Sequence, residues 1–184
     1  KKKNCIVTYH PTTINEDKFI EKEIDIILSA LAKLPENHGF IITGANSDLK
    51  GDLFNKKIRD FVKKKENMEF FMSLGQELYL NSLKHCDCVI GNSSSGLYEA
   101  PSFNIPTVNI GDRQKGRICA KSVFNCDLDN SDIYNTITKA LKSKLTNIVN
   151  PYGDGDSAKK ITKILTDIKE PKDLLRKKFY IKND

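Results

Sequence analysis

The stretch CVIGNSSSGLYEAPSFNIPTVNIGDRQKGR, residues 88–117, decides the fold of this chain. It opens with an apolar run at residues 88–90, typical of a buried strand, and breaks at Gly91 into small hydroxyl residues. A short helical segment at residues 96–100 and a second apolar strand at residues 107–110 follow. A strand, a turn, a helix and another strand in this order predict a unit of a parallel α/β sheet.

The turn between the first strand and the helix has the composition of an anion-binding turn. The N-terminus of a helix leaves backbone N–H groups unpaired and carries partial positive charge, and small side chains let a phosphate approach. One turn later, Glu99 is a carboxylate that can accept two hydrogen bonds from a sugar diol, and the loop after the second strand is rich in arginine. These features indicate a nucleotide diphosphate site. Its expected substrate-binding residues are Asn92, Ser93, Ser94, Ser95, Gly96, Glu99, Arg113 and Arg117.

The same turn also fits a simpler structural interpretation. Gly, Asn and Ser are ordinary turn formers, and a serine-rich turn before a helix often serves only as a cap. The chain contains neither G-x-x-x-x-G-K-S/T nor G-x-G-x-x-G, so the fingerprints of P-loop and dinucleotide-binding proteins are absent from the sequence. From the residues alone, the phosphate site and the plain cap both stay open.

Apolar runs alternate with amphipathic segments along the whole chain. Further strands are expected at residues 5–9, 40–43, 68–72 and 123–126, and further helices at residues 15–31, 54–65, 76–84, 133–141 and 161–168, the first of them capped by Asn15. Because the strands are nearly unbroken apolar runs, the expected fold is a doubly wound, Rossmann-like α/β domain with a parallel sheet. Ligands of such sheets bind beyond the carboxyl ends of the strands. The residues expected at that edge are His10, 44–48, 73–75, 92–96 and Arg113.

Length and composition suit one soluble domain with its own core, since the chain has 184 residues, 39% of them hydrophobic and 29% charged. The net charge is +6, and residues 159–184 supply most of it, with nine Lys or Arg against four Asp or Glu. Aromatic residues do not interleave with the basic ones as a stacking platform requires, so no nucleic-acid partner is expected. No apolar stretch approaches the roughly 20 residues that span a bilayer, so no membrane partner is expected.

The five cysteines, an odd number at irregular spacings, favour reduced thiols in a cytoplasmic protein over a disulfide framework. His85, Cys86 and Cys88 lie close together in the sequence, but no second pair follows at the spacing of a zinc site. We therefore expect no metal ion and no cofactor.

The string GNSSSGLYEAPSFNIPTVNIGDRQKGR resembles the signature of the hydrolysing UDP-N-acetylglucosamine 2-epimerases, which open sialic or legionaminic acid synthesis. Three further stretches agree with that family in the same order: VTYHPTT at residues 7–13, IITGANSD at residues 41–48 and NPYGDGDSAKKI at residues 150–161. Such an ordered set of motifs is specific. The resemblance covers nearly the whole chain but only the C-terminal half of that family.

The resemblance implies the C-terminal domain of a glycosyltransferase-B architecture. Residues 1–170 would form a UDP-binding Rossmann-like domain, and residues 171–184 a C-terminal helix or tail that contacts a missing N-terminal domain, unless they form an ordinary C-terminal helix. The implied reaction removes the C2 proton of UDP-N-acetylglucosamine, expels UDP to leave a glycal, and adds water to give N-acetylmannosamine or a related sugar.

The resemblance also assigns roles to residues. It makes His10 the catalytic residue beside the diphosphate and the sugar, Glu99 the ribose ligand, and Arg113 with the serine turn the groups that stabilise the leaving phosphate. The carboxylates that handle the C2 proton would belong to the missing N-terminal domain, so this chain alone is expected to be inactive. Two alternatives stay open, a glycosyltransferase of the same architecture and a non-catalytic nucleotide-binding domain. The identity of the sugar and a homo-oligomeric state stay open as well.

Overall fold

The computed structural model describes residues 2–12, 17–46 and 50–175, without the side chains of residues 17–19, 21 and 173. The expected helix cap Asn15, part of the expected 44–48 loop, and residues 176–184 of the expected tail lie outside the described residues. Contacts within the chain divide it into two units, Lys1–Pro151 and Tyr152–Asp184. The sheet and every candidate site residue belong to the first unit.

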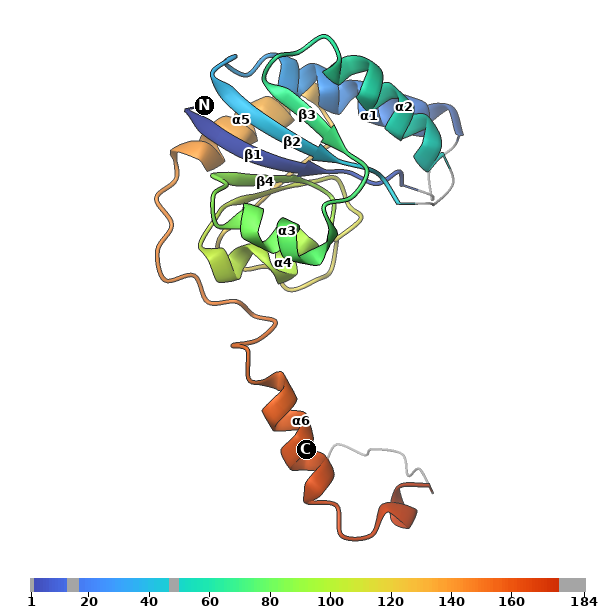
Figure 1. Cartoon of the computed structure of the whole chain (residues 1–184), viewed down its shortest axis with the longest axis vertical. Helices are drawn as coiled ribbons and strands as arrows, with labels where there is room; N and C mark the ends of the chain where they lie inside the picture. Colours follow the sequence, from blue (N-terminus) through green and yellow to red (C-terminus); the bar gives the residue numbers. More distant parts are fainter. Residues whose placement is uncertain (1, 13–16, 47–49, 176–184) are drawn as a thin grey trace. The chain divides into compact units, whose positions relative to one another are not determined.

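Six parallel strands form one sheet in the order β3-β2-β1-β4-β5-β6. Figure 1 shows β3, β2, β1 and β4 side by side in this order. Their bounds are β1 Lys3–Thr8, β2 His38–Thr43, β3 Met68–Phe71, β4 Cys88–Gly91, β5 Thr107–Ile110 and β6 Val123–Cys126. The predicted doubly wound α/β fold is therefore confirmed, with strand ends that differ from the expected ones by two residues at most. The strand order is that of the Rossmann fold, because the chain runs outward from β1 to β3 and then returns to the other side of β1.

The helices follow the predicted order. Their bounds are α1 Asp17–Ala32, α2 Gly51–Val62, α3 Gly75–Leu83, α4 Ser95–Tyr98, η1 Ala100–Phe103 and α5 Asn130–Lys142 in the first unit, and α6 Ser157–Thr166 and η2 Pro171–Leu175 in the second. Helix α2 starts three residues earlier than expected because Lys50 turns the chain with a left-handed backbone, φ 66°, which the apolar pattern does not reveal. None of the described helices is long and apolar enough to cross a membrane.

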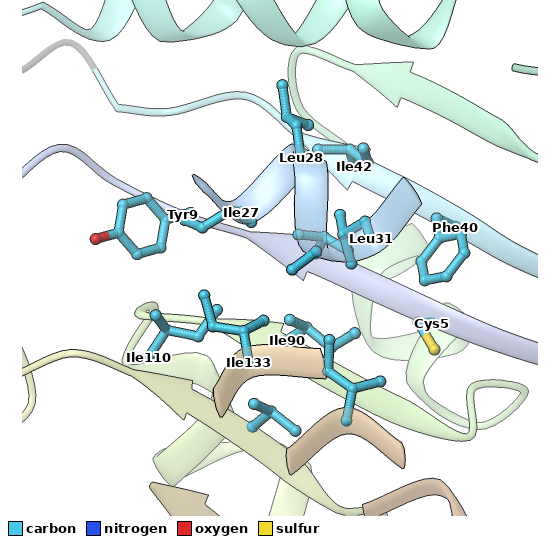
Figure 2. Close-up of a cluster of buried hydrophobic side chains, with 14 of the residues drawn as sticks. Cys5, Tyr9, Ile27, Leu28, Leu31, Phe40, Ile42, Ile90, Ile110 and Ile133 are labelled. Atoms are coloured by element: carbon cyan, nitrogen blue, oxygen red, sulfur yellow. The ribbon is translucent and has the colours of Figure 1, made fainter. Parts of the chain in front are cut away.

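Successive residues of β1 face opposite sides of the sheet and enter two separate cores. Cys5 and Val7 pack in the larger core with buried side chains of α1, α2 and α5, and Figure 2 shows Leu31 of α1 and Ile133 of α5 in this cluster. Ile6 packs on the opposite side with Leu83 of α3. Because both faces are covered, the strands are apolar on both faces, which explains their nearly continuous hydrophobic sequence.

The second unit contrasts with this packing. Helix α6 has no buried residue, and its apolar side chains Ile161, Ile164 and Leu165 are exposed. A helix of this length is marginal in water without tertiary contacts. The apolar spacing that predicted α6 was therefore correct for the helix but did not predict a core position within the described chain.

Candidate functional site

Asn92 joins the carboxyl ends of β1 and β4, where the chain reverses its direction of winding. Its side chain is buried; Oδ1 accepts a hydrogen bond from the backbone N–H of His10 at 2.8 Å, and Nδ2 donates to the carbonyl oxygen of His10 at 2.8 Å. The backbone N–H of Asn92 donates to the carbonyl oxygen of Thr8 at 3.2 Å. Asn92 thus continues the pairing of the two strands through its side chain and fixes the main chain of His10.

His10 is held through its ring as well. The backbone N–H of Asn46, in the loop after β2, donates to Nδ1 of His10 at 3.1 Å. Because Nδ1 accepts this hydrogen bond, the neutral imidazole carries its hydrogen on Nε2. The topology therefore brings the ends of β1, β2 and β4 together around His10, as expected for the carboxyl edge of the sheet.

The serine turn, residues 92–96, enters α4 without a capping hydroxyl on Ser94, the residue that precedes the helix. Among the described residues, the Oγ of Ser93 accepts a single long hydrogen bond of 3.4 Å, from the N–H of Ser95. Within the described part of the chain, the backbone N–H groups of Ser93 and Ser94 have no hydrogen-bond partner. Unpaired backbone donors of this kind are what a phosphate uses at a helix N-terminus. A side-chain cap would have bonded the N–H groups of Gly96 or Leu97 instead, which donate here to the carbonyl oxygens of Ser93 and Ser94.

Two cavities flank the serine turn. The first, which we name the glutamate cavity, has a volume of about 390 Å³ and is lined by Ser93, Ser95 and Glu99 among the predicted residues. Its other lining residues are Thr8, Thr43, Gly44, Met72, Ser73, Leu74, Gly75, Gln76 and Tyr79. The expected residues 73–75 thus share a cavity with part of the serine turn.

Glu99 is the chemically unusual group of the glutamate cavity. Its side chain is half-buried, and its Oε2 is buried without a hydrogen-bond partner among the residues that the structure describes. The hydroxyl of Tyr79 pairs with the Oγ of Ser95 on the same cavity wall. Burial raises the pKa of Tyr79 to about 12, with a smaller contribution from the Glu99 charge, so this phenol is neutral at neutral pH. The cavity is therefore lined by Ser93, whose backbone N–H is unpaired, and by Glu99, whose carboxylate has one oxygen without a donor among the described residues.

The second cavity, which we name the arginine cavity, has a volume of about 640 Å³ and is lined by Asn92, Arg113 and Arg117 among the predicted residues. Its other lining residues are Tyr9, Thr12, Glu23, Asn109, Ile110, Gly111, Asp112, Gln114, Lys115, Gly116, Cys119, Asn125, Cys126, Asp127, Leu128 and Asp132. The predicted site residues are thus shared between two cavities rather than gathered in one.

The two arginines differ in their surroundings. Arg113 donates through Nη1 to the carbonyl oxygen of Asn92 at 3.1 Å, and Gln114 donates to the same oxygen at 2.7 Å. Arg113 therefore lies directly beside the serine turn. The guanidinium of Arg117 stacks over the ring of Tyr98, with 5.5 Å between its central carbon and the ring centre, and its Nη1 donates to the Tyr98 hydroxyl at 2.9 Å.

The remaining predicted residues, His10, Ser94 and Gly96, line neither cavity. Gly96 has a packing role, since a Cβ atom there would lie 2.4 Å from the Cγ2 of Thr107. The absence of a side chain at Gly96 lets α4 approach β5, and Thr107 donates to the carbonyl oxygen of Gly96 at 2.8 Å. Packing at Gly96 thereby fixes the end of the serine turn against the sheet.

Several residues around the site were not anticipated from the sequence, notably Tyr79 and Glu23. Glu23 is fully buried and accepts hydrogen bonds from the hydroxyl of Tyr9 at 3.2 Å and from the hydroxyl of Thr12 at 2.9 Å. The sequence did contain a sign of this buried contact, because Glu23 lies three positions after Ile20, on the apolar face of α1. A carboxylate on that face predicts a buried polar contact, here with the loop after β1.

The strand order and the position of the site at the β1–β4 junction define a class, the doubly wound Rossmann-like α/β domains. The chain superimposes on the UDP-GlcNAc 2-epimerase of Methanocaldococcus jannaschii, solved in complex with UDP-GlcNAc and UDP, with a TM-score of 0.71 and 18% identity over 89% of this chain and 45% of that chain. The chain belongs to the UDP-N-acetylglucosamine 2-epimerase family, whose family model matches residues 1–166.

Curated relatives extend this assignment. The chain is 33% identical to a polysialic acid biosynthesis protein of Escherichia coli over 183 residues, which cover 97% of this chain and 46% of that protein. It is 39% identical over 128 residues to the hydrolysing GDP/UDP-N,N'-diacetylbacillosamine 2-epimerase of Campylobacter jejuni, covering 69% of this chain and 33% of that protein. The chain therefore spans less than half the length of each of these relatives.

Proposed function

We propose that this chain is the UDP-binding half of a hydrolysing UDP-N-acetylglucosamine 2-epimerase, which converts its nucleotide sugar and water to N-acetylmannosamine, or a related sugar, and UDP. The observation that carries the proposal is the glutamate cavity, which is lined by Glu99, whose Oε2 lacks a donor among the described residues, and by Ser93, whose backbone N–H is unpaired. A ribose diol supplies donors and a diphosphate supplies acceptors, so a nucleoside diphosphate satisfies both at once.

Family membership supports a uridine nucleotide in this role. Solved relatives include the Methanocaldococcus jannaschii enzyme with UDP-GlcNAc and UDP, a Staphylococcus aureus protein with UDP and the Neisseria meningitidis enzyme with UDP-GlcNAc. In the present chain, Glu99 would accept both ribose hydroxyls, and the N–H groups of Ser93 and Ser94 would bind the diphosphate. Asn92, Ser95 and Gly96 hold the turn in shape, and Arg117 stays a predicted ligand whose guanidinium is stacked on Tyr98.

The chemistry follows from where charge develops. Expulsion of UDP builds negative charge on the β-phosphate, and groups that interact with it more strongly in the transition state than in the ground state accelerate the reaction. Arg113 is suited to this task because its guanidinium is anchored beside the serine turn through Asn92. His10 lies at the same edge and, in its Nε2–H form, offers a donor or a proton there.

In this proposal, the transfer of the C2 proton depends on residues that lie outside this chain. The carboxylates that move the C2 proton lie in an N-terminal domain, so this chain alone is inactive. Residues 1–170 serve as the UDP-binding domain, and the tail at residues 171–184 contacts the N-terminal domain. The exposed apolar side chains of α6 support such a contact in the C-terminal region.

The five free cysteines suit a reducing cytoplasm, and the product enters sialic or legionaminic acid synthesis.

Thermal unfolding of this chain with UDP and with uridine tests the nucleotide site. A ligand that binds only the folded state stabilises it by about 2.7 kcal/mol at a hundredfold excess over its Kd. UDP should raise the melting temperature by several degrees, and uridine at the same concentration should raise it much less because it lacks the diphosphate. Equal shifts would remove the diphosphate from the proposal.

A product assay on the full-length enzyme tests the reaction. Incubation with UDP-N-acetylglucosamine and no acceptor should release UDP and free N-acetylmannosamine, or the corresponding product from a related nucleotide sugar. A glycosyltransferase would require an acceptor for sugar transfer, and a non-catalytic domain would release neither product. Either result would overturn the epimerase assignment while leaving the UDP site to the binding experiment.

A further inference from the structure

A second buried side-chain amide, that of Asn55, holds the main chain that follows β2, as Asn92 holds the main chain that follows β1. Asn55 of α2 is 2% exposed, and its Oδ1 accepts a hydrogen bond from the backbone N–H of Ala45 at 2.8 Å. Its Nδ2 donates to the carbonyl oxygen of Ala45 at 3.4 Å. With one donor and one acceptor facing it, the amide has a single orientation that satisfies both contacts.

The two amides act on the same imidazole from different directions. Asn92 fixes the main chain of His10, while Asn55 fixes Ala45, whose neighbour Asn46 donates its backbone N–H to Nδ1 of His10. Asn55 touches neither cavity that surrounds the serine turn. Its connection to the site therefore runs through the main chain of residues 45 and 46.

The loop that Asn55 holds has little room to move toward β3. A Cβ atom on Gly44 would lie 2.8 Å from the carbonyl oxygen of Met72 and 3.3 Å from the Oδ1 of Asn55. The main chain at Gly44 therefore passes close to the end of β3 as well as to Asn55. This close passage restricts the positions from which Asn46 can donate to His10.

From this geometry we infer that Asn55 and Asn92 are positioning residues that together hold His10 in its Nε2–H tautomer. A backbone N–H beside Nδ1 disfavours hydrogen on that nitrogen, because two N–H groups would then face each other. This preference for Nε2–H persists only while the His10 ring and the backbone N–H of Asn46 are held within hydrogen-bond distance of each other. Its importance for catalysis rests on the proposed function, in which His10 acts on the diphosphate or the sugar, whereas the tautomer itself is a property of the unliganded chain.

Nitrogen-15 NMR of the imidazole rings tests the inference directly, since the two ring nitrogens differ in shift according to which bears hydrogen. The chain has three histidines, so a His10→Gln variant assigns the resonance. The neutral ring of His10 in the wild-type chain should carry hydrogen on Nε2 alone. In Asn55→Ala and Asn92→Ala, hydrogen should be shared between the two nitrogens.

Asn67→Ala is the matched control. Asn67 donates to the carbonyl oxygen of His38 at 3.0 Å, so this variant removes an amide contact to the opposite end of the same strand β2. It should leave the His10 spectrum unchanged even if it lowers the melting temperature. If Asn55→Ala does not fold, the same measurement is made on Asn55→Thr, which puts a shorter hydroxyl side chain where the amide stood.

Kinetics of the full-length enzyme provide the second readout. Asn55→Ala should lower kcat by about ten- to a hundredfold with little change in KM, the size expected when a catalytic group is misplaced by about 1 Å. Hydrogen on Nδ1 in the wild type, or a wild-type tautomer in both variants, would overturn the inference. A chain that fails to bind UDP would overturn the proposed function and leave the tautomer result standing.

Discussion

The main chain of Gly91 lies so close to Thr8 that a Cβ atom on Gly91 would stand 1.9 Å from the carbonyl oxygen of Thr8. The two residues are register partners in the last pair between β1 and β4. Gly91 also has φ 132°, a backbone conformation that favours glycine. The carboxyl ends of β1 and β4 are therefore joined by a backbone contact that only a residue without a side chain permits, and Asn92 follows directly.

Replacement of Gly91 by alanine should destabilise the chain severely. Backbone strain costs about 1–3 kcal/mol and overpacking about 1–3 kcal/mol more, so the free energy of unfolding should fall by roughly 2–6 kcal/mol. Urea unfolding measures the loss. Gly116→Ala separates the two causes, because Gly116 has φ 84° with no atom within 4 Å of the added Cβ, and it should cost only the strain. Equal losses in the two variants would contradict the tight contact with Thr8.

Much of the fold was predictable because a parallel sheet buries both faces of its strands. Apolar runs such as residues 107–110 and 123–126 then coincide with the strands that form. The alternation of strands and helices further determined which residues follow strand ends, and so placed His10, Asn92 and Arg113 at one edge. The start of α2 was not predictable, since it depends on a left-handed turn at Lys50 that leaves no hydrophobic pattern.

Residue roles within the site were harder to predict than residue positions. The sequence marks Asn92 as a polar residue in a turn, but only the structure shows that its amide is occupied by the main chain of His10. Similarly, Arg113 and Arg117 are equivalent in a basic loop until the loop path brings one to Asn92 and the other to Tyr98. Side-chain targets depend on three-dimensional contacts between distant segments, which spacing along the chain does not encode.

The buried thiols should make the protein less stable in alkali. Burial raises the pKa of the Cys88 thiol above its ordinary value of 9.0, so the folded state keeps the proton while the unfolded chain releases it. The stabilisation is complete below about pH 9 and is lost as pH rises further, at about 1.4 kcal/mol per pH unit for one such group. Above about pH 9, the free energy of unfolding measured with urea should therefore fall with pH less steeply in Cys88→Ala than in the wild type, by this amount.

Cys119→Ala is the control for this pH dependence, because Cys119 is exposed while Cys88 is buried. Cys119→Ala should retain the wild-type slope. A Cys88→Ala variant whose stability falls as steeply with pH as the wild type would show that ionisation of Cys88 in the unfolded state is not linked to folding.

The substitution Glu99→Gln tests whether this side chain binds a ribose or merely carries charge near a helix. If the carboxylate accepts hydrogen bonds from both ribose hydroxyls, the amide, which accepts through one oxygen, loses a charged hydrogen bond worth roughly 1.5–3 kcal/mol. The affinity for UDP, measured by calorimetry on this chain, should fall by about one to two orders of magnitude. Stability without ligand should hardly change or should rise, because the buried Oε2 of Glu99 has no hydrogen-bond partner among the described residues.

Two comparisons make the Glu99 experiment specific. Glu77→Gln removes an exposed carboxylate from the first turn of α3 and should leave UDP affinity unchanged. With 2′,3′-dideoxy-UDP, which lacks both ribose hydroxyls, the wild type should bind far more weakly than with UDP, and Glu99→Gln should bind the two ligands nearly alike. A Glu99→Gln variant that binds UDP as tightly as the wild type, or that loses stability while keeping its affinity, would show that Glu99 does not hold the ribose. In that case the serine turn and Arg113 would remain the proposed diphosphate ligands, and Glu99 would be a charged side chain beside a helix end without a role in binding.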